Sequence, residues 1–391
     1  MAFPAAPVEV EQHAPRARTA TLLFVLFCLG HASVDLYSAA LGALQPLLGA
    51  RFGLSFTQAG VLGGVLVFSA SVLQPLYGYL SDRYRSRLFA ALAPAVAGVF
   101  ISSLGWAPGF WVLALMVFLG GAGVASFHPQ AASNAVAHIT RNRARAMSFF
   151  ICSGSMGLAL GPAFFSAVAA GGLKRTVWCA VPGLLVSALL VAVMPAPAAR
   201  TGRKPFNWAP LRAVWKPMTI LYFLVFIRSI VQITLTQFLP LYLQTLRGYS
   251  LRAASLSLSV YLVGGTLGGL AGGTLADRFG GKRVILFSMI GSFPFLALFL
   301  FTTGAPSVAG LMLSGLILLL ANPVNIVMAQ ELAPAQGGTV SALMMGFAWG
   351  MAGMVFIPLT GWVADLVGLQ PAFAGLAAFP LIGSLLALKL K

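Results

Sequence analysis

Apolar residues dominate the chain in long runs, and short polar or Gly/Pro-rich stretches separate these runs. From Thr21 onwards the runs reach about 20 residues or more, the length that an α-helix needs to cross the hydrocarbon core of a bilayer. Breaking the chain at its polar stretches predicts twelve helices, at residues 19–49, 55–81, 86–105, 109–139, 143–171, 174–195, 216–246, 250–276, 282–303, 306–333, 336–366 and 371–389. The pattern therefore predicts an all-α polytopic membrane protein with twelve transmembrane helices.

The longest polar break divides the predicted helices into two sets of six. It extends from Pro195 to Lys216 and predicts a cytoplasmic linker at residues 196–215. We therefore expect a cytoplasmic N-terminal tail at 1–18, an N-terminal six-helix half at 19–195 and a C-terminal six-helix half at 216–391.

The two halves repeat one another at an offset of about 195 residues. The stretch "GYLSDRYRSR", which begins at Gly78, matches "GTLADRFGGKR", which begins at Gly273. "FHP" and "ANP" also correspond, since Pro129 and Pro323 are 194 residues apart. Two parallel repeats of this kind place a binding site between the halves near the bilayer midplane, and rocking of the halves alternates access to it.

The distribution of basic residues predicts the orientation in the membrane. Most of the 24 lysines and arginines fall at every second loop or at a terminus, whereas the alternate loops hold only Arg51, Lys174, Arg175, Arg247 and Arg252. Because Lys and Arg favour the cytoplasmic side, we expect both termini in the cytoplasm and a location in a bacterial-type inner (plasma) membrane. Orientation accounts for the net charge of +17, so we expect no nucleic-acid partner.

The composition argues against soluble and enzymatic classes. Only 8% of the residues are charged, against about 25% in soluble domains. The three cysteines lie inside apolar segments, without the clustered spacing of disulfide or zinc sites. The chain also has no nucleophile elbow, HExxH motif or Walker loop. We therefore expect no enzyme activity, no metal and no cofactor.

The repeated loop resembles the signature loop of the major facilitator superfamily. Further blocks are similar to the fosmidomycin-resistance transporters of that superfamily and extend over nearly the whole chain: "HASVDLYSAALGALQPLL", "LQPLYGYLSDRY", "GAGVASFHPQAAS", "AQELAPAQGGTVSAL" and "GFAWGMAGM". The resemblance implies the major facilitator fold, with two pseudo-symmetric six-helix halves, and secondary active transport.

Charged residues near the predicted helix ends are candidates for gating. Asp82 precedes Arg83 in one copy of the loop, and Asp277 precedes Arg278 in the other. We expect each carboxylate to cap a neighbouring helix N-terminus in one conformation and to release it in the other. The alternative is an element of topology and packing. Glu331, near the cytoplasmic end of the tenth predicted helix, is a further gating candidate, although charge near the interface is inexpensive.

Asp35 lies near the middle of the first predicted helix, one turn after His31. A carboxylate at this depth must be paired, protonated or directed into a cavity. If its protonation depends on conformation, Asp35 can couple proton movement to transport. The alternative is a fixed ion pair.

Arg228 is the only cation predicted in the middle of a span, and the repeat aligns it with Ser33. The first and seventh helices face each other in the fold that the resemblance implies, so Asp35 and Arg228 should face the same cavity. A guanidinium binds phosphate or phosphonate through two parallel hydrogen bonds. The alternatives are a permanent salt bridge with Asp35, or competition of substrate and proton for that pair.

His128 and Pro129 combine an ionisable side chain with a residue that disturbs a helix. Histidine can change its charge near neutral pH, so we expect His128 to serve in proton coupling and substrate binding. Asn322 and Pro323 give the other half a corresponding break, which points to the binding site. The alternative is a packed histidine beside a kink. The predicted substrate site comprises His31, Asp35, His128, Gln130, Arg228, Gln232, Asn322 and Asn325.

The stretch after His128 departs from the family pattern. A glutamate commonly follows His-Pro in the family, and an arginine comes three residues after it, whereas this chain has Gln130 and Ser133. Both changes together remove an ion pair on one helix face. Proton coupling is therefore expected to rest on Asp35, His128 or both.

The stretch "SGSMGLALGP", from Ser153 to Pro162, resembles the fifth-helix motif of proton antiporters and favours export. We therefore predict a monomeric, proton-coupled antiporter in the lipid bilayer that exports small anionic or amphiphilic compounds resembling fosmidomycin. The alternatives are an importer or a metabolite exporter on the same fold. A non-transporting receptor would require a large soluble domain, and the longest tail ends near Arg18.

Overall fold

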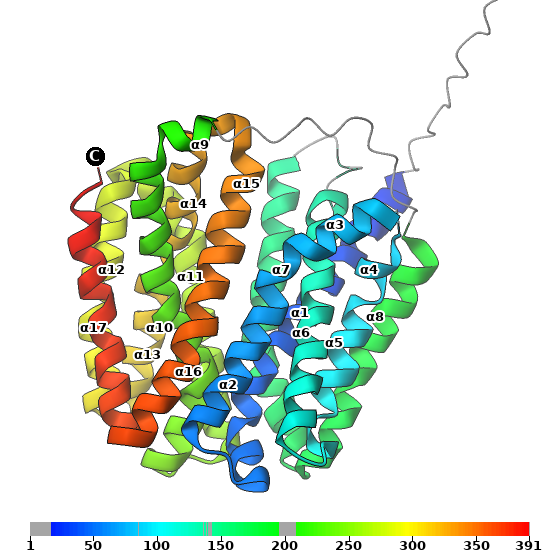
Figure 1. Ribbon diagram of the computed structural model, residues 1–391, viewed down its shortest axis with the longest axis vertical. Coiled ribbons are helices and arrows are strands. Elements are labelled where there is room, and N and C mark those ends of the chain that lie inside the picture. Colours follow the sequence, from blue (N-terminus) through cyan, green and yellow to red (C-terminus); the bar gives the residue numbers. More distant parts are fainter. Residues whose placement is uncertain are drawn as a thin grey trace, which may run out of the picture.

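The computed structural model describes residues 17–84, 86–135, 137, 139, 143–194 and 209–390, which form helices and short connections without a β-strand. Within this part of the chain, eleven helices are long and apolar enough to cross a membrane. A shorter apolar segment, Leu88–Ser102, occupies the place of the third predicted span. These segments confirm the all-α polytopic fold with twelve helices, arranged in two bundles that lie side by side (Figure 1).

The N-terminal bundle contains three helices longer than 25 residues and several shorter elements. Its elements in chain order are α1 (Ala17–Phe52), α2 (Phe56–Val67), the π-helix η1 (Phe68–Val72), α3 (Gln74–Tyr84), α4 (Leu88–Ala91), α5 (Ala93–Ser102), the 3₁₀ turn η2 (Leu104–Trp106), α6 (Phe110–Ala135), α7 (Arg143–Ala169), the 3₁₀ segment η3 (Leu173–Cys179) and α8 (Ala180–Val193). Together α2, η1 and α3 form one span that is interrupted only by its π-helical turn.

The C-terminal bundle follows the same plan. Its elements are α9 (Ala209–Ala213), α10 (Trp215–Arg247), α11 (Leu251–Phe279), α12 (Gly281–Phe301), α13 (Gly304–Leu319), α14 (Ala321–Leu332), the 3₁₀ turn η4 (Pro334–Gln336), α15 (Gly337–Ser341), the π-helix η5 (Ala342–Ala348), α16 (Trp349–Val367) and α17 (Leu369–Ala387). Here α15, η5 and α16 form one span.

The sequence repeat extends to the local backbone geometry. Gly53 and Gly248 both have left-handed backbones, with φ of 61° and 64°, which a residue without a Cβ adopts easily. Ser55 and Ser250 follow them and cap the next helices, α2 and α11, through their hydroxyl oxygens. The same turn and cap therefore recur in both halves, 195 residues apart.

The two ends of the molecule are distinguished by the connections that they carry. We call the end with α9 the linker end, and the opposite end, where α1 ends and α2 begins, the far end (Figure 1). The halves meet where α1 crosses α10, because a Cβ added to Gly42 would lie 2.0 Å from the backbone oxygen of Thr236. The pairs α2–α16 and α7–α11 also pack across the boundary between the halves.

Large apolar side chains point outward as well as inward, as a bilayer requires. Trp111, with 80% of its surface exposed, and Leu185, with 61%, are examples on the outer surface. Tyr37, Phe127 and Phe238 are fully buried in the bundles. The apolar outer surface agrees with a multi-pass membrane protein.

The two repeat-related prolines affect their helices differently. α6 continues through His128 and Pro129 as one helix. In the other half, α13 ends at Leu319 and α14 begins at Ala321, just before Pro323. A continued helix keeps most backbone groups paired in an apolar environment, which explains why α6 tolerates its proline.

Candidate functional site

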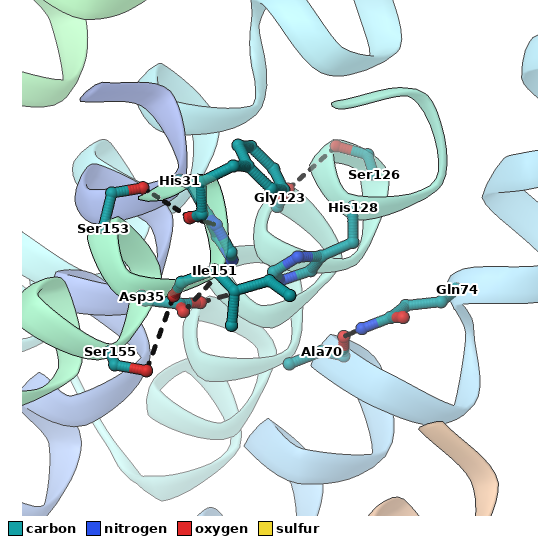
Figure 2. Close-up of polar contacts among 11 residues, drawn as sticks. His31, Asp35, Ala70, Gln74, Gly123, Ser126, His128, Ile151, Ser153 and Ser155 are labelled. Carbon is teal, nitrogen blue, oxygen red and sulfur yellow. Dashed lines mark hydrogen bonds and ion pairs between the residues drawn. The ribbon is translucent and has the colours of Figure 1, made fainter. Parts of the chain in front are cut away.

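Three ionisable side chains that the sequence pattern singled out lie together in the N-terminal half (Figure 2). His31 and Asp35 come from α1, and His128 comes from α6. The carboxylate of Asp35 lies between the two imidazoles, with its Oδ2 3.4 Å from Nε2 of His31 and its Oδ1 3.6 Å from Nε2 of His128. We call these three residues the His–Asp–His cluster.

His31 is held in place by α7. Its Nδ1 lies 2.8 Å from the backbone oxygen of Phe150, and because a carbonyl oxygen only accepts, Nδ1 must carry a proton and donate it. The imidazole also stacks on the ring of Phe150, with 4.3 Å between the ring centroids. These two contacts aim Nε2 of His31 at Asp35. In a neutral ring this nitrogen has a lone pair, and only a protonated ring offers Asp35 a hydrogen-bond donor there.

Gly154 makes room for the cluster on α7. A Cβ at this position would lie 2.4 Å from Nε2 of His31 and 2.5 Å from Oδ2 of Asp35, which is closer than atoms can approach without displacement. Along the same helix face, a Cβ at Gly157 would lie 2.0 Å from the backbone oxygen of Ala32. The glycines of the "SGSMGLALGP" motif therefore allow α7 to approach α1 closely, as the small residues predicted.

The cluster is largely but not completely enclosed. The exposed fractions of the side chains are 11% for His31, 14% for Asp35 and 24% for His128. Both nitrogen–oxygen distances exceed those of ordinary N–H···O hydrogen bonds, so neither imidazole is locked to the carboxylate. All three groups therefore remain partly accessible, and no short hydrogen bond joins Asp35 to either imidazole.

Arg228 occupies a different environment, on α10 of the C-terminal half. Only 2% of its surface is exposed. Its Nη1 donates to Oε1 of Gln232 at 2.6 Å and its Nη2 donates to the hydroxyl of Ser229 at 3.1 Å, whereas its buried Nε has no hydrogen-bond partner. Among the described residues, no carboxylate lies within ion-pairing distance of Arg228, so the alternative of a salt bridge with Asp35 is not formed here.

The remaining predicted substrate residues separate into two groups. Gln130 lies on α6 near the cluster in sequence, but its amide nitrogen donates to the hydroxyl of Ser81 and, at 2.9 Å, to the backbone oxygen of Ser86. It therefore ties α6 to the signature loop. On α14, Asn325 is fully buried and both of its amide atoms lack a hydrogen-bond partner, whereas Asn322 is partly exposed.

The predicted gating residues lie at the helix ends. Arg83 is exposed, and its Nη1 approaches the hydroxyl of Tyr79 at 3.4 Å. Asp277, Arg278 and Glu331 are exposed, and within the described part of the chain neither acidic side chain forms an ion pair. The side chain of Asp82 lies outside the described residues. A latch role for these residues stays a prediction.

Sequence reasoning did not identify the supporting residues on α7. Phe150 lies 119 residues from its partner His31, and no local pattern connects two positions at such a separation. The glycine-rich motif did signal close helix contact, but it did not indicate that Gly154 would face the ionisable pair.

Comparisons with known proteins agree with this architecture. The profile of the Major Facilitator Superfamily matches residues 23–347 and 248–391. The chain is 30% identical to the uncharacterized MFS-type transporter YfnC of Bacillus subtilis, over 97% of this chain and 96% of that protein. It is 29% identical to the fosmidomycin resistance protein of Escherichia coli, over 95% of this chain and 93% of that protein.

A solved structure gives the same result for the fold. The crystal structure of the nucleoside transporter NupG superimposes with a TM-score of 0.76 and 13% sequence identity, and covers 94% of this chain and 98% of that chain. The relatives and the structural neighbour are transporters, not enzymes. The chain therefore belongs to the major facilitator superfamily of membrane transporters and resembles its fosmidomycin-resistance members.

Proposed function

We propose that this transporter is a proton-coupled antiporter that exports small anionic or amphiphilic compounds by alternating access. One observation carries the proposal. Within the described residues, the carboxylate of Asp35 and the guanidinium of Arg228 are not paired with each other. Asp35 faces two imidazoles, and Arg228 is hydrogen-bonded only to neutral groups. Each of these two side chains can therefore bind a partner that is taken up and released during transport.

The His–Asp–His cluster supplies the proton site in this proposal. Asp35 can carry one proton itself or share it with His31 or His128, and its charge then depends on which side of the membrane the cluster meets. Intramembrane ionisable groups of this kind are expensive to maintain and commonly mark proton relays. Their partial exposure supports access by protons.

Arg228 supplies the anion site. A buried cation without a counter-ion costs several kcal/mol, which an anionic ligand can offset. The guanidinium can offer two parallel N–H groups to a phosphonate, phosphate or carboxylate. Gln232, already hydrogen-bonded to Arg228, would position the guanidinium.

The two sites lie at similar depth. Asp35 is seven residues and Arg228 is eight residues from the crossing of α1 and α10 at Gly42 and Thr236, which corresponds to about 10–12 Å along each helix axis. Both precede the crossing in helices that begin at the linker end. This arrangement supports a shared binding site between the halves.

Antiport requires that proton and substrate exclude each other. A substrate with a hydrogen-bond donor beside its anionic group meets this requirement, because the donor binds deprotonated Asp35 while the anion binds Arg228. A purely anionic substrate would instead bind better when Asp35 is protonated, since protonation removes a repulsive charge. That second case is proton symport and corresponds to the importer alternative.

Flux measurements in proteoliposomes distinguish these functions. We expect uptake of fosmidomycin and phosphate esters to accelerate when the imposed proton gradient is directed opposite to substrate movement. Asp35→Asn should abolish this acceleration. Acceleration by a gradient in the same direction as substrate movement would establish symport. Flux that is independent of the gradient in wild type as well as in Asp35→Asn would contradict proton coupling.

A further inference from the structure

Asp365, near the far end of α16, contacts the first residues of α2 in the other half. Its Oδ1 accepts the backbone N–H of Phe56 at 2.9 Å, and its Oδ2 accepts the backbone N–H of Thr57 at 2.8 Å. The hydroxyl of Thr57 also donates to Oδ2, at 2.5 Å. One carboxylate therefore receives three hydrogen bonds from a helix that belongs to the opposite half.

These bonds complete the N-terminus of α2. The first N–H groups of a helix have no partner within the helix, and they attract negative charge. Ser55 supplies a partner from its own half, because its hydroxyl oxygen accepts the N–H of Gln58 at 3.1 Å. Asp365 accepts hydrogen bonds from the N–H groups of Phe56 and Thr57, which the hydroxyl of Ser55 does not bind. The start of α2 is thus capped partly by its own half and partly by the other half.

The backbones of the two helices also touch beside this contact. A Cβ at Gly361 would lie 2.1 Å from the backbone oxygen of Phe56, so only glycine permits this approach. One helical turn further along α2, a Cβ at Gly60 would lie 2.7 Å from the backbone oxygen of Ile357. Because α2 and α16 are this close, the halves cannot separate at the far end without breaking the bonds to Asp365.

We propose that Asp365 is a gating residue that stabilises the conformation closed at the far end and releases α2 when that end opens. The proposal depends on alternating access but not on the identity of the substrate or of the coupling ion. The repeat aligns Asp365 with Ala170, so the contact has no counterpart in the other half. It lies at the end opposite to the signature loops with Asp82 and Asp277.

The two spans that pack against each other across the boundary each contain a π-helical segment. η1 interrupts the span of α2 and α3, and η5 interrupts the span of α15 and α16. The two segments lie against each other across the boundary. π-Helical turns often occur at functional sites, and here they lie between the far-end contact and the linker end.

The test compares two caps of the same helix. Asp365→Ala removes the cap that crosses between the halves, whereas Gln58→Ala removes a capping bond within one half, in which Oε1 of Gln58 accepts the backbone N–H of Ser55 at 3.0 Å. Loss of an exposed N-cap shifts an equilibrium by roughly fivefold. We therefore expect Asp365→Ala to raise the population open at the far end about fivefold, and Gln58→Ala to leave that population unchanged because its bond lies within the N-terminal half.

The populations can be measured by pulsed electron spin resonance between nitroxides at positions 51 and 252, in protein with Cys28, Cys152 and Cys179 replaced by serine. Arg51 and Arg252 are exposed and lie at the far end in opposite halves. Thr57→Val serves as a milder second variant, which removes only the hydroxyl bond and should give a smaller shift in the same direction. Distance distributions identical to wild type in both Asp365→Ala and Thr57→Val, or an equal shift in Gln58→Ala, would overturn the proposal. Substrate flux is not needed for this measurement, so the result is independent of the proposed export function.

Discussion

Replacement of Arg228 by methionine should separate the function of this residue from its contribution to folding. The guanidinium is 2% exposed, its Nε lacks a partner, and its two hydrogen bonds end on neutral side chains. If this cation is retained for binding an anion, the protein should tolerate its loss structurally and lose transport. We expect Arg228→Met to fold normally and to fail in anion binding.

The expected change in the free energy of unfolding follows from the balance of these contacts. Desolvation of an unpaired ion costs several kcal/mol, and each hydrogen bond from a charged donor returns about 1.5–3 kcal/mol. Methionine removes both contributions but leaves Oε1 of Gln232 without its donor, and an unsatisfied buried acceptor costs about 1–3 kcal/mol of stability. Replacement of poorly compensated buried charges by apolar residues is often neutral or stabilising. The net change in the free energy of unfolding should therefore lie within about 1 kcal/mol of zero or favour the variant.

Arg247 provides a matched control on the same helix. Its guanidinium donates to the backbone oxygens of Phe299, Leu300 and Thr302 and to the hydroxyls of Tyr242 and Ser307. Arg247→Met removes all five of these bonds, and among the described residues only the oxygens of Phe299 and Leu300 keep another donor, from Ser307 and Gln370 respectively. We expect it to destabilise the protein by at least about 3 kcal/mol, the value of one or two bonds from a charged donor.

The assay is thermal unfolding in detergent, with and without fosmidomycin or inorganic phosphate. A ligand at about 100 times its Kd stabilises a protein by about 2.7 kcal/mol, so wild type should unfold at a higher temperature when ligand is present. Arg228→Met should unfold near the wild-type temperature and gain nothing from ligand. If Arg228→Met is as unstable as Arg247→Met, or if it retains the ligand shift, the assignment of Arg228 to anion binding is wrong.

Three further predictions concern the cluster and the topology. His128→Ala should weaken substrate binding or change the pH dependence of flux, and an unchanged affinity and pH profile would show that the histidine only packs. Gly154→Ala should displace the cluster and cost about 1–3 kcal/mol of stability through overpacking, whereas Gly269→Ala, where an added Cβ meets no atom within 4 Å, should be neutral or stabilising in unfolding assays. Single cysteines at Lys174 and Arg252 should react with an impermeant thiol reagent from outside the cell, and reaction only after permeabilisation would reverse the predicted orientation.

The spans could be predicted from the sequence because a bilayer imposes length and apolarity on each helix. The repeat was equally visible, and the matching geometry at Gly53 and Gly248 confirms it. The third span differs in detail, since it is divided into α4 and α5. Pro94 lies at the start of α5, where its missing N–H is not needed, and this local chemistry explains the division.

Contacts between distant segments could not be predicted in the same way. The i, i+4 spacing of His31 and Asp35, and that of Arg228 and Gln232, is local, and helical periodicity alone places each pair on one helix face. The contact of Asp365 with Thr57 joins residues 308 positions apart, and the repeat partner of Asp365 is an alanine. Such contacts depend on how the two halves are oriented, and a pattern read along one chain contains no information on that orientation.

The duplicated halves have diverged at the positions that carry charge. The repeat aligns Arg228 with Ser33 and aligns Asp35 with Ile230. The N-terminal half therefore holds the carboxylate, and the C-terminal half holds the guanidinium. If both charges were in one half, the packing of that half would fix their separation, and rocking could not change their interaction. With the charges in opposite halves, their separation depends on the conformation. The free energy of binding a proton to Asp35, or an anion to Arg228, then depends on the conformation as well. In the proposed mechanism, this division is what makes proton and anion occupancy depend on which side is open, and such dependence is the physical requirement for coupled transport.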